Sequence, residues 1–205
     1  MWLLLPAYEY NKFRKADIAY DSQVKSQYDF ATQNPHAWKE ISMQPKIKTA
    51  TNGSRAILAK HQELINVYRS KRKADLSAIL IAEMNHEFLT GVTNYWDEMA
   101  MLLAAKEKIA ALGITNNPRI TQIYEMEVFP SLDSAQKDLE NRIAFIAAKG
   151  KQVSGKQADV DQARELVLNH SENLAGLIEM LIERKKDARD ALIKFEARPG
   201  SAPGN

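Results

Sequence analysis

The chain has 205 residues, of which 45% are hydrophobic and 26% charged, and this length and composition suit a folded domain with a substantial core. Its 28 basic and 26 acidic residues give a net charge of +2, which is too small to indicate a nucleic-acid partner. The absence of cysteine excludes disulfides, thiolate nucleophiles and thiolate metal sites.

Residues 1–7 are an apolar segment that is followed by aromatic and basic side chains. Only five residues precede Pro6, whereas a membrane-spanning helix needs about 20 apolar residues and a secretory signal needs a basic start and a longer apolar run. Three interpretations stay open: a short membrane-proximal anchor, the remnant of a longer span, or apolar residues that pack in a bundle core.

The next segment, residues 8–32, is predicted to be helical. Its apolar and aromatic positions recur at mixed spacings of three and four: Tyr10, Phe13, Ile18 or Asp17, Tyr20, Val24, Tyr28 and Phe30. Pro35 ends this helix, because the residue before a proline is pushed out of the helical region. Two prolines and a Thr-Asn-Gly sequence predict a loop over residues 34–53, with a short turn near 36–43.

A very long helix is predicted over residues 55–112, which contain one glycine and no proline. Ser54 suits the N-cap and Gly113 the residue after the C-cap. Such a helix would be roughly 85–90 Å long, and a break or kink is expected near Gly91.

The following helix begins at Asn117-Pro118, with asparagine as the cap and proline in the first helical position. Pro130 predicts a kink or a fresh start. The helix then continues to Gly150 along an apolar row with a spacing of seven residues: Leu132, Leu139 and Ile146.

The loop over residues 150–155 is short, so the last helix, at about 156–197, must return antiparallel to its predecessor. Its seam repeats every seven residues, with polar interruptions at His170 and Arg184. The seam residues are Val160, Val167, Leu174, Leu181, Ala188 and Phe195.

These elements predict an all-α fold: an elongated antiparallel helical bundle or coiled coil of three long helices plus a shorter N-terminal helix. No alternating strand pattern occurs between turn signals. The expected organisation is the apolar segment 1–7, one helical bundle domain over 8–198, and a flexible tail over 199–205.

The one short motif with a chemical mechanism is Glu83-x-x-His86, which ferritin-like di-metal proteins use twice. The second copy is missing, because neither His61 nor His170 follows a glutamate at that spacing. On one continuous helix, His61 and His86 would be roughly 37 Å apart and could not share a ligand. We therefore predict no metal site, no cofactor and no catalytic residue, and expect a protein that is not an enzyme.

Two basic runs are candidates for contact with an anionic surface, such as a membrane. The alternative is an ordinary solvated face, because acidic residues are interspersed with both runs. The candidate residues are Arg69, Lys71, Arg72, Lys73, Lys185, Lys186 and Arg189.

Residues 67–99, VYRSKRKADLSAILIAEMNHEFLTGVTNYWDEM, resemble a long helix in BAR modules of the sorting-nexin kind. The shared features are a basic run, an aspartate, spaced aliphatic residues and Tyr-Trp. The resemblance implies a helical dimer that binds curved membranes through basic faces. In that family such a helix closes the domain, whereas here two more helices are predicted to follow.

The function favoured by these patterns is that of a non-enzymatic coiled-coil scaffold, which associates with itself or with another helical protein. A membrane surface is one place where this scaffold could act. The alternative is a helical sensor or ligand-binding module for a small anionic ligand. Arg184 and His170 discriminate between them: facing a second chain they would specify assembly, and converging on a cavity they would indicate a ligand. The sequence leaves the small molecule and the cellular compartment open, with peripheral or N-terminal attachment to a membrane as one option.

Overall fold

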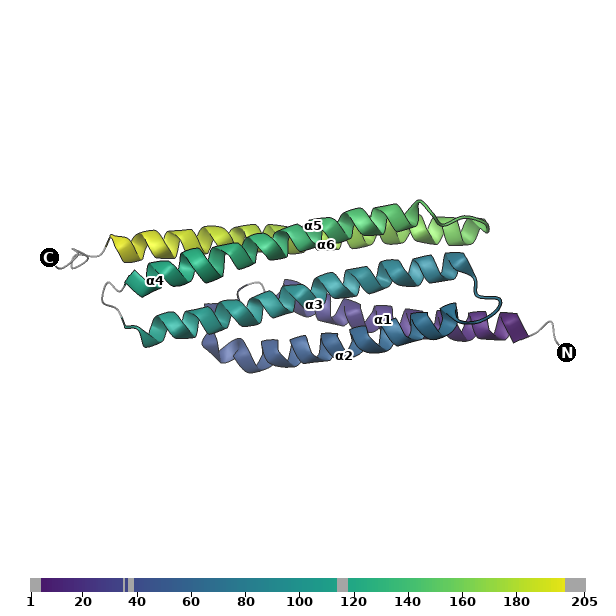
Figure 1. Ribbon diagram of the computed structural model, residues 1–205, viewed down its shortest axis with the longest axis horizontal. Helices are drawn as coiled ribbons and strands as arrows, with labels where there is room; N and C mark the ends of the chain where they lie inside the picture. Colours follow the sequence, from purple (N-terminus) through teal and green to yellow (C-terminus); the bar gives the residue numbers. More distant parts are fainter. Residues whose placement is uncertain (1–4, 35, 37–38, 114–117, 198–205) are drawn as a thin grey trace.

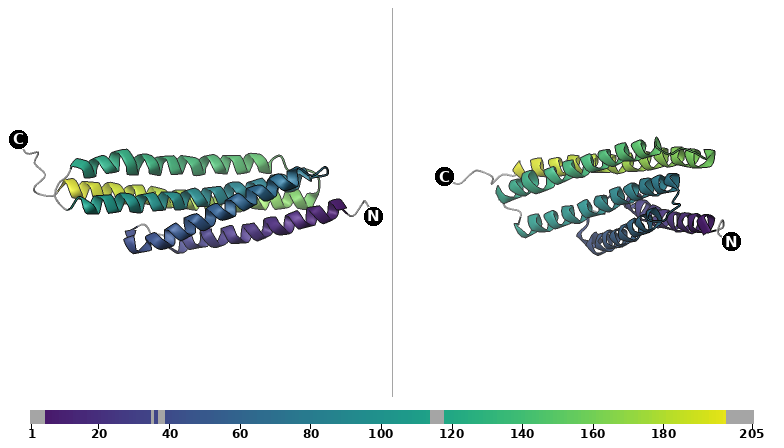
Figure 2. Two further views of the ribbon diagram at one scale, coloured as in Figure 1. Left: turned by 60° about the horizontal axis from the view of Figure 1, so that its bottom comes forward. Right: turned by 45° about the vertical axis from the view of Figure 1, so that its right-hand side comes forward.

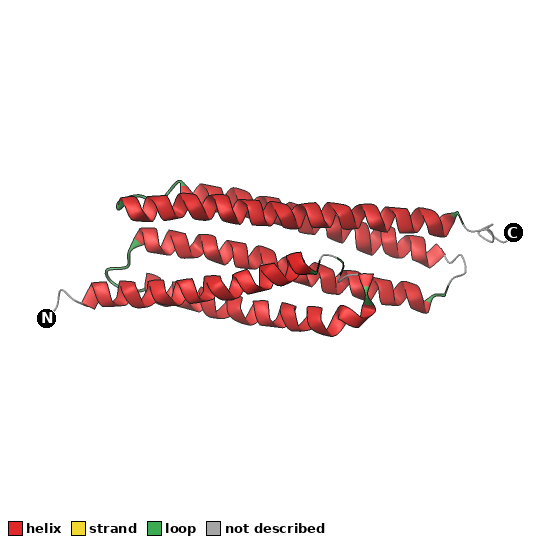
Figure 3. Ribbon diagram, turned by 180° about the vertical axis from the view of Figure 1, so that it is seen from behind, coloured by secondary structure: helices red, strands yellow, loops and turns green. Residues whose placement is uncertain are grey.

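The computed structural model describes residues 5–34, 36, 39–113 and 118–197. These residues form long helices joined by short connections, and no strand occurs among them (Figure 3). The predicted all-α, elongated antiparallel bundle is therefore confirmed. Residues 1–4 of the apolar segment and the predicted tail 199–205 lie outside the described residues.

Five rods make up the bundle, and one of them has three parts. The elements are α1 (Leu5–Gln33), the short η2 (Ile41–Met43), α2 (Gln44–Arg69), α3 (Leu76–Ala111), the rod of α4 (Pro118–Ile123), η3 (Tyr124–Val128) and α5 (Phe129–Gly150), and α6 (Gln157–Glu196).

Helix α3 lies between two helix pairs, with α1 and α2 on one side and α5 and α6 on the other (Figures 1 and 2). Its sequence explains this position, because apolar residues cover more than one face. All six residues from 77 to 82 are buried, and they include Ile79, Leu80 and Ile81. A helix that is apolar all round is stable only when neighbours surround it.

The predicted helix over residues 55–112 is wrong in its continuity. It is divided between α2 and α3 by a turn over residues 70–75, and the two parts run antiparallel. The break needs no glycine or proline, because Asp75 caps the second part: its Oδ1 accepts a hydrogen bond from the Ala78 backbone nitrogen at 3.0 Å.

The predicted loop over 34–53 is also wrong in its second half, since α2 begins at Gln44 and Ser54 lies inside it rather than capping it. Pro45 occupies the first turn of α2, where its missing N–H costs nothing. Residues 35, 37 and 38 of the predicted turn and the predicted cap Asn117 lie outside the described residues. Gly113 is confirmed as the residue after the α3 C-cap, with a φ of 79°.

Gly91 does not break α3, which is α-helical on both sides of it. A Cβ atom at this position would lie 2.7 Å from Leu174 Cδ2 and 3.2 Å from Leu139 Cδ2. The glycine therefore marks a place where α5 and α6 approach the α3 backbone closely.

Pro130 is accommodated by a π-helical segment, η3, which ends two residues before it at Val128. A proline clashes with the carbonyl group four residues earlier and cannot donate to it. The wider π turn relieves this conflict, so the rod continues into α5.

The seam of α6 packs within the same chain. Leu174, Leu181 and Ala188 belong to the main core together with Leu132, Leu139 and Ile146 of α5. Arg184 interrupts the seam as expected, yet it is only 1% exposed.

Candidate functional site

The two predicted basic runs lie far apart. Arg69, Lys71, Arg72 and Lys73 lie at the turn between α2 and α3. The first turn of α3, which follows it, contacts the turn between α5 and α6: Ser77 Oγ donates to the Ser154 carbonyl at 2.7 Å. Lys185 lies 28 residues into α6 from Gln157, which corresponds to about 42 Å along the helix. The two runs therefore cannot act on one small ligand.

Several of these side chains have partners. Arg69 pairs with Glu83, Lys185 pairs with Asp133, and Lys71 Nζ lies 3.7 Å from Glu9 Oε2. The guanidinium of Arg189 lies 6.0 Å from the centroid of the Phe129 ring. The remaining three, Arg72, Lys73 and Lys186, are exposed.

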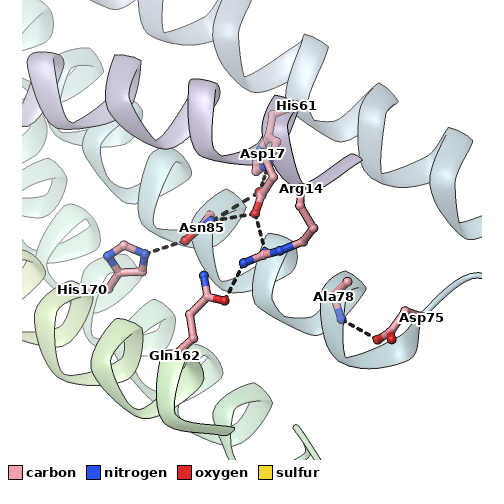
Figure 4. A network of polar contacts seen from close by, with 8 residues as sticks. All are labelled: Arg14, Asp17, His61, Asp75, Ala78, Asn85, Gln162 and His170. Carbon is pink, nitrogen blue, oxygen red and sulfur yellow. Dashed lines mark hydrogen bonds and ion pairs between the residues drawn. The ribbon is translucent and has the colours of Figure 1, made fainter. Parts of the chain in front are cut away.

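A buried polar network connects four helices, α1, α2, α3 and α6, in the part of the bundle nearer the turns over residues 70–75 and 151–156 (Figure 4). At its centre is the Asp17 carboxylate of α1, which is fully buried and accepts from three other side chains. Arg14 Nη1 donates at 3.0 Å, His61 Nε2 lies at 3.0 Å, and Asn85 Nδ2 donates to both oxygens at 3.3 Å. Burial of an aspartate is tolerated because these donors replace its water.

The network extends to α6 through two further contacts. His170 Nε2 lies 2.9 Å from Asn85 Oδ1, and Arg14 also donates to Gln162. The amide group of Asn85 is oriented by Asp17, so its oxygen faces His170 and the imidazole donates through Nε2–H. Burial lowers the pKa of His170 to about 4, so this imidazole is neutral at neutral pH.

His61 and His86 are neighbours, contrary to the expected separation of roughly 37 Å. Their ring centroids are 5.5 Å apart, because the turn over 70–75 folds α3 back along α2. Burial, followed by the charges of His61 and Arg142, lowers the pKa of His86 to about 4. Both Nδ1 atoms are buried without a hydrogen-bond partner.

The Glu83-x-x-His86 motif does not converge on a common ligand. Glu83 pairs instead with Arg69 and with Lys149, whose Nζ lies 2.7 Å from its Oε2. Among the described residues, no group of three or more histidine, aspartate or glutamate side chains is placed to hold a metal ion.

A separate pocket of about 600 Å³ lies between α3, η3 and α6, near the C-terminal ends of α3 and α6. Its lining is mainly apolar, with contributions from Leu102, Ile109, Tyr124, Val128 and Ala188. A smaller hollow of about 380 Å³ shares part of this lining and reaches Phe195. The size is in the usual range of small-molecule sites.

Six charged side chains also line this pocket, four of them basic: Lys39, Lys106, Arg184, Lys194, Asp187 and Asp190. Arg184 is the buried one, and it donates to the Met180 carbonyl at 3.1 Å and to Tyr95 Oη at 3.3 Å. Lys39 Nζ lies 2.8 Å from Asp187 Oδ2 at the rim. Burial and the neighbouring charge of Lys39 lower the pKa of Lys106, against the opposing effect of Glu40.

Arg184 and His170 therefore do not converge on one cavity. Arg184 lines the pocket, whereas His170 faces the polar network on α3. Sequence patterns did not single out Asp17, although it occupies one of the recurring apolar positions of α1. The structure resolves that ambiguity, since Asp17 is buried and Ile18 is 56% exposed.

Comparison with protein-family models, with curated proteins and with solved structures finds no match to this chain.

Proposed function

We propose that the protein is a non-enzymatic helical binding module that holds a small organic anion with an apolar body in the pocket beside Arg184. The observation that carries this proposal is the position of Arg184, a nearly inaccessible guanidinium in the wall of a mainly apolar pocket.

Charge and surface in the pocket complement such a ligand. The guanidinium has already lost its water, so an incoming carboxylate gains attraction in a region of low effective dielectric constant. Lys39, Lys106 and Lys194 add positive charge at the rim, and Asp187 and Asp190 offset only part of it. Leu102, Ile109 and Val128 offer apolar area for the rest of the molecule.

Isothermal titration calorimetry with decanoate, decanol and decylamine tests both requirements. We expect the carboxylate to bind most tightly, since it alone satisfies the apolar lining and the basic wall. Replacing Ala191, which lines the pocket, by tryptophan should abolish binding by filling the space. Ala158→Trp, at an exposed position of the same helix far from the pocket, is the matched control and should bind as the wild type does.

Equal affinity for the three compounds would show that Arg184 does not recognise the carboxylate. Unchanged decanoate binding by Ala191→Trp would show that the ligand does not enter this pocket.

Self-association as a scaffold is a second candidate, supported by apolar side chains on the outer face of α6. Leu168 and Ile182 are 59% and 51% exposed, and each lies seven residues from Ala175. An antiparallel α6 of a second copy, centred on Ala175, would place Leu168 against Ile182. Light scattering at several concentrations tests this candidate: Ile182→Lys should shift a dimer to a monomer, and a monomeric wild type would reject it.

A further inference from the structure

Three separate segments form one end of the bundle: the start of α1, the turn between α2 and α3, and the turn between α5 and α6 (Figure 1, right). Direct contacts join them. Lys156 Nζ lies 5.2 Å from the centroid of the Tyr10 ring, and Ser77 Oγ donates to the Ser154 carbonyl. The rings of Phe13 and Tyr68 stack with centroids 4.0 Å apart. The end of the bundle is therefore a defined surface rather than three independent loops.

This surface, which we call the basic end, is rich in positive charge. The turns over residues 70–75 and 151–156 contain five basic residues and one acidic residue. The acidic one, Asp75, is engaged in capping α3, and at the start of α1 Glu9 Oε2 lies 3.7 Å from Lys71 Nζ. The five basic residues, all exposed, are Lys71, Arg72, Lys73, Lys151 and Lys156. Only the first of these two turns stands out as a basic run in the sequence, because the two come together only in the fold.

The basic end also exposes apolar side chains beside these charges. Tyr8 is 62% exposed in the first turns of α1, and Leu76 is 67% exposed at the start of α3. Val67, 52% exposed, lies in the last turn of α2. A tyrosine and aliphatic residues next to lysine and arginine are typical of surfaces that enter the headgroup region of a bilayer.

We propose that the basic end docks onto an anionic membrane surface, with the helices standing away from the bilayer. The lysines and arginines of the two turns attract acidic headgroups, and Tyr8 and Leu76 enter the interface between headgroups and acyl chains. The mixture of both kinds of side chain favours a lipid surface over an acidic protein or a nucleic acid, which would be recognised by charge with little exposed apolar surface.

Peripheral docking needs no transmembrane helix, and in the described part of the chain none of the helices combines the length and apolar character needed to cross a bilayer. The proposal is independent of the ligand pocket, which lies among the last turns of α3 and α6 at the opposite end of the bundle.

Sedimentation with vesicles tests the proposal directly. The full chain is mixed with vesicles of phosphatidylcholine, or of phosphatidylcholine with 30% phosphatidylglycerol, at low and high salt. The first variant reverses three charges of the basic end, Lys71→Glu, Arg72→Glu and Lys73→Glu. The matched control reverses the other predicted run, Lys185→Glu, Lys186→Glu and Arg189→Glu, about 40 Å away along α6.

We expect the wild type to bind the anionic vesicles, to bind pure phosphatidylcholine much more weakly, and to lose affinity as salt rises. The variant at residues 71–73 should bind about 100-fold more weakly, since each charge near an anionic bilayer changes affinity several-fold, whereas the control should bind as the wild type does. A variant with Tyr8→Ser and Leu76→Ser should lose about tenfold while keeping the same dependence on salt.

Three results would overturn the proposal: no vesicle binding by the wild type, equal loss in both charge-reversed variants, or wild-type affinity in the variant at residues 71–73. Tight binding to a DNA duplex without vesicle binding would assign the basic end to nucleic acid instead. Circular dichroism melts identify any variant that fails to fold, and Lys151→Glu with Lys156→Glu then provides a second test on the neighbouring turn.

Discussion

Replacing Gly91 by alanine should destabilise the protein, although alanine is the better helix former. The added Cβ would lie 2.7 Å from Leu174 Cδ2 and 3.2 Å from Leu139 Cδ2, where ordinary contacts are 3.4–4 Å. Neither leucine can yield easily, because both are almost completely buried. The gain in helix propensity is about 1 kcal/mol, and overpacking of a core usually costs about 1–3 kcal/mol in total. The difference between these two effects is a net loss of up to about 2 kcal/mol.

Gly53 provides the matched control, because it is also helical and a Cβ there would meet only Gln27 Nε2 at 3.9 Å. Gly53→Ala should therefore stabilise the protein by about 0.5–1 kcal/mol. Urea denaturation, followed by circular dichroism, measures both changes on the same scale. If Gly91→Ala stabilises the protein as much as Gly53→Ala does, the side chains of Leu139 and Leu174 do not pack directly against the α3 backbone at Gly91.

Three further predictions concern the buried groups. Stability should be complete above about pH 6.5 and fall toward pH 4, since folding lowers the pKa of His86 and His170 to about 4 and the unfolded chain takes up those protons first. Of this loss in the free energy of unfolding, His170 should account for about 3 kcal/mol and the more exposed His86 for less. In His170→Gln, the urea midpoint should therefore change less between pH 7 and pH 5 than it does in the wild type. A wild-type midpoint that does not depend on pH would contradict this prediction. Asp17→Asn should cost about 3 kcal/mol, because it leaves the partly buried charge of Arg14 without its carboxylate; a cost below about 0.5 kcal/mol would mean that the network is not closed. Leu181→Ala should cost about 2–5 kcal/mol in the same urea assay, and a surface-like value would show that the α6 seam is not packed.

The sequence predicts the fold class because periodic apolar rows reflect the local geometry of each helix. It fails at the turn over residues 70–75, where Asp75 was a usable N-cap signal, but its neighbours are good helix formers. That single break changes which residues meet, since it brings His61 beside His86.

The polar network shows a different limit of sequence reasoning. Asp17 and Asn85 look like ordinary helix-surface residues until three other helices are placed around them. No local pattern records that Asp17 of α1 and His170 of α6 are connected through Asn85. The pocket is equally invisible in the sequence, because Lys39 and Arg184 come to line one cavity only after the chain has folded.

The central position of α3 affects how the molecule comes apart. The two pairs, α1 with α2 and α5 with α6, each resemble a helical hairpin that could exist separately, and a protein built in this way could melt in two steps. Here both pairs cover the same apolar helix, so the loss of either one exposes part of the buried surface of α3 to water. Neither half can be released at low cost, and α3 makes the bundle a single cooperative unit in which the first opening of one side exposes a surface prone to aggregation.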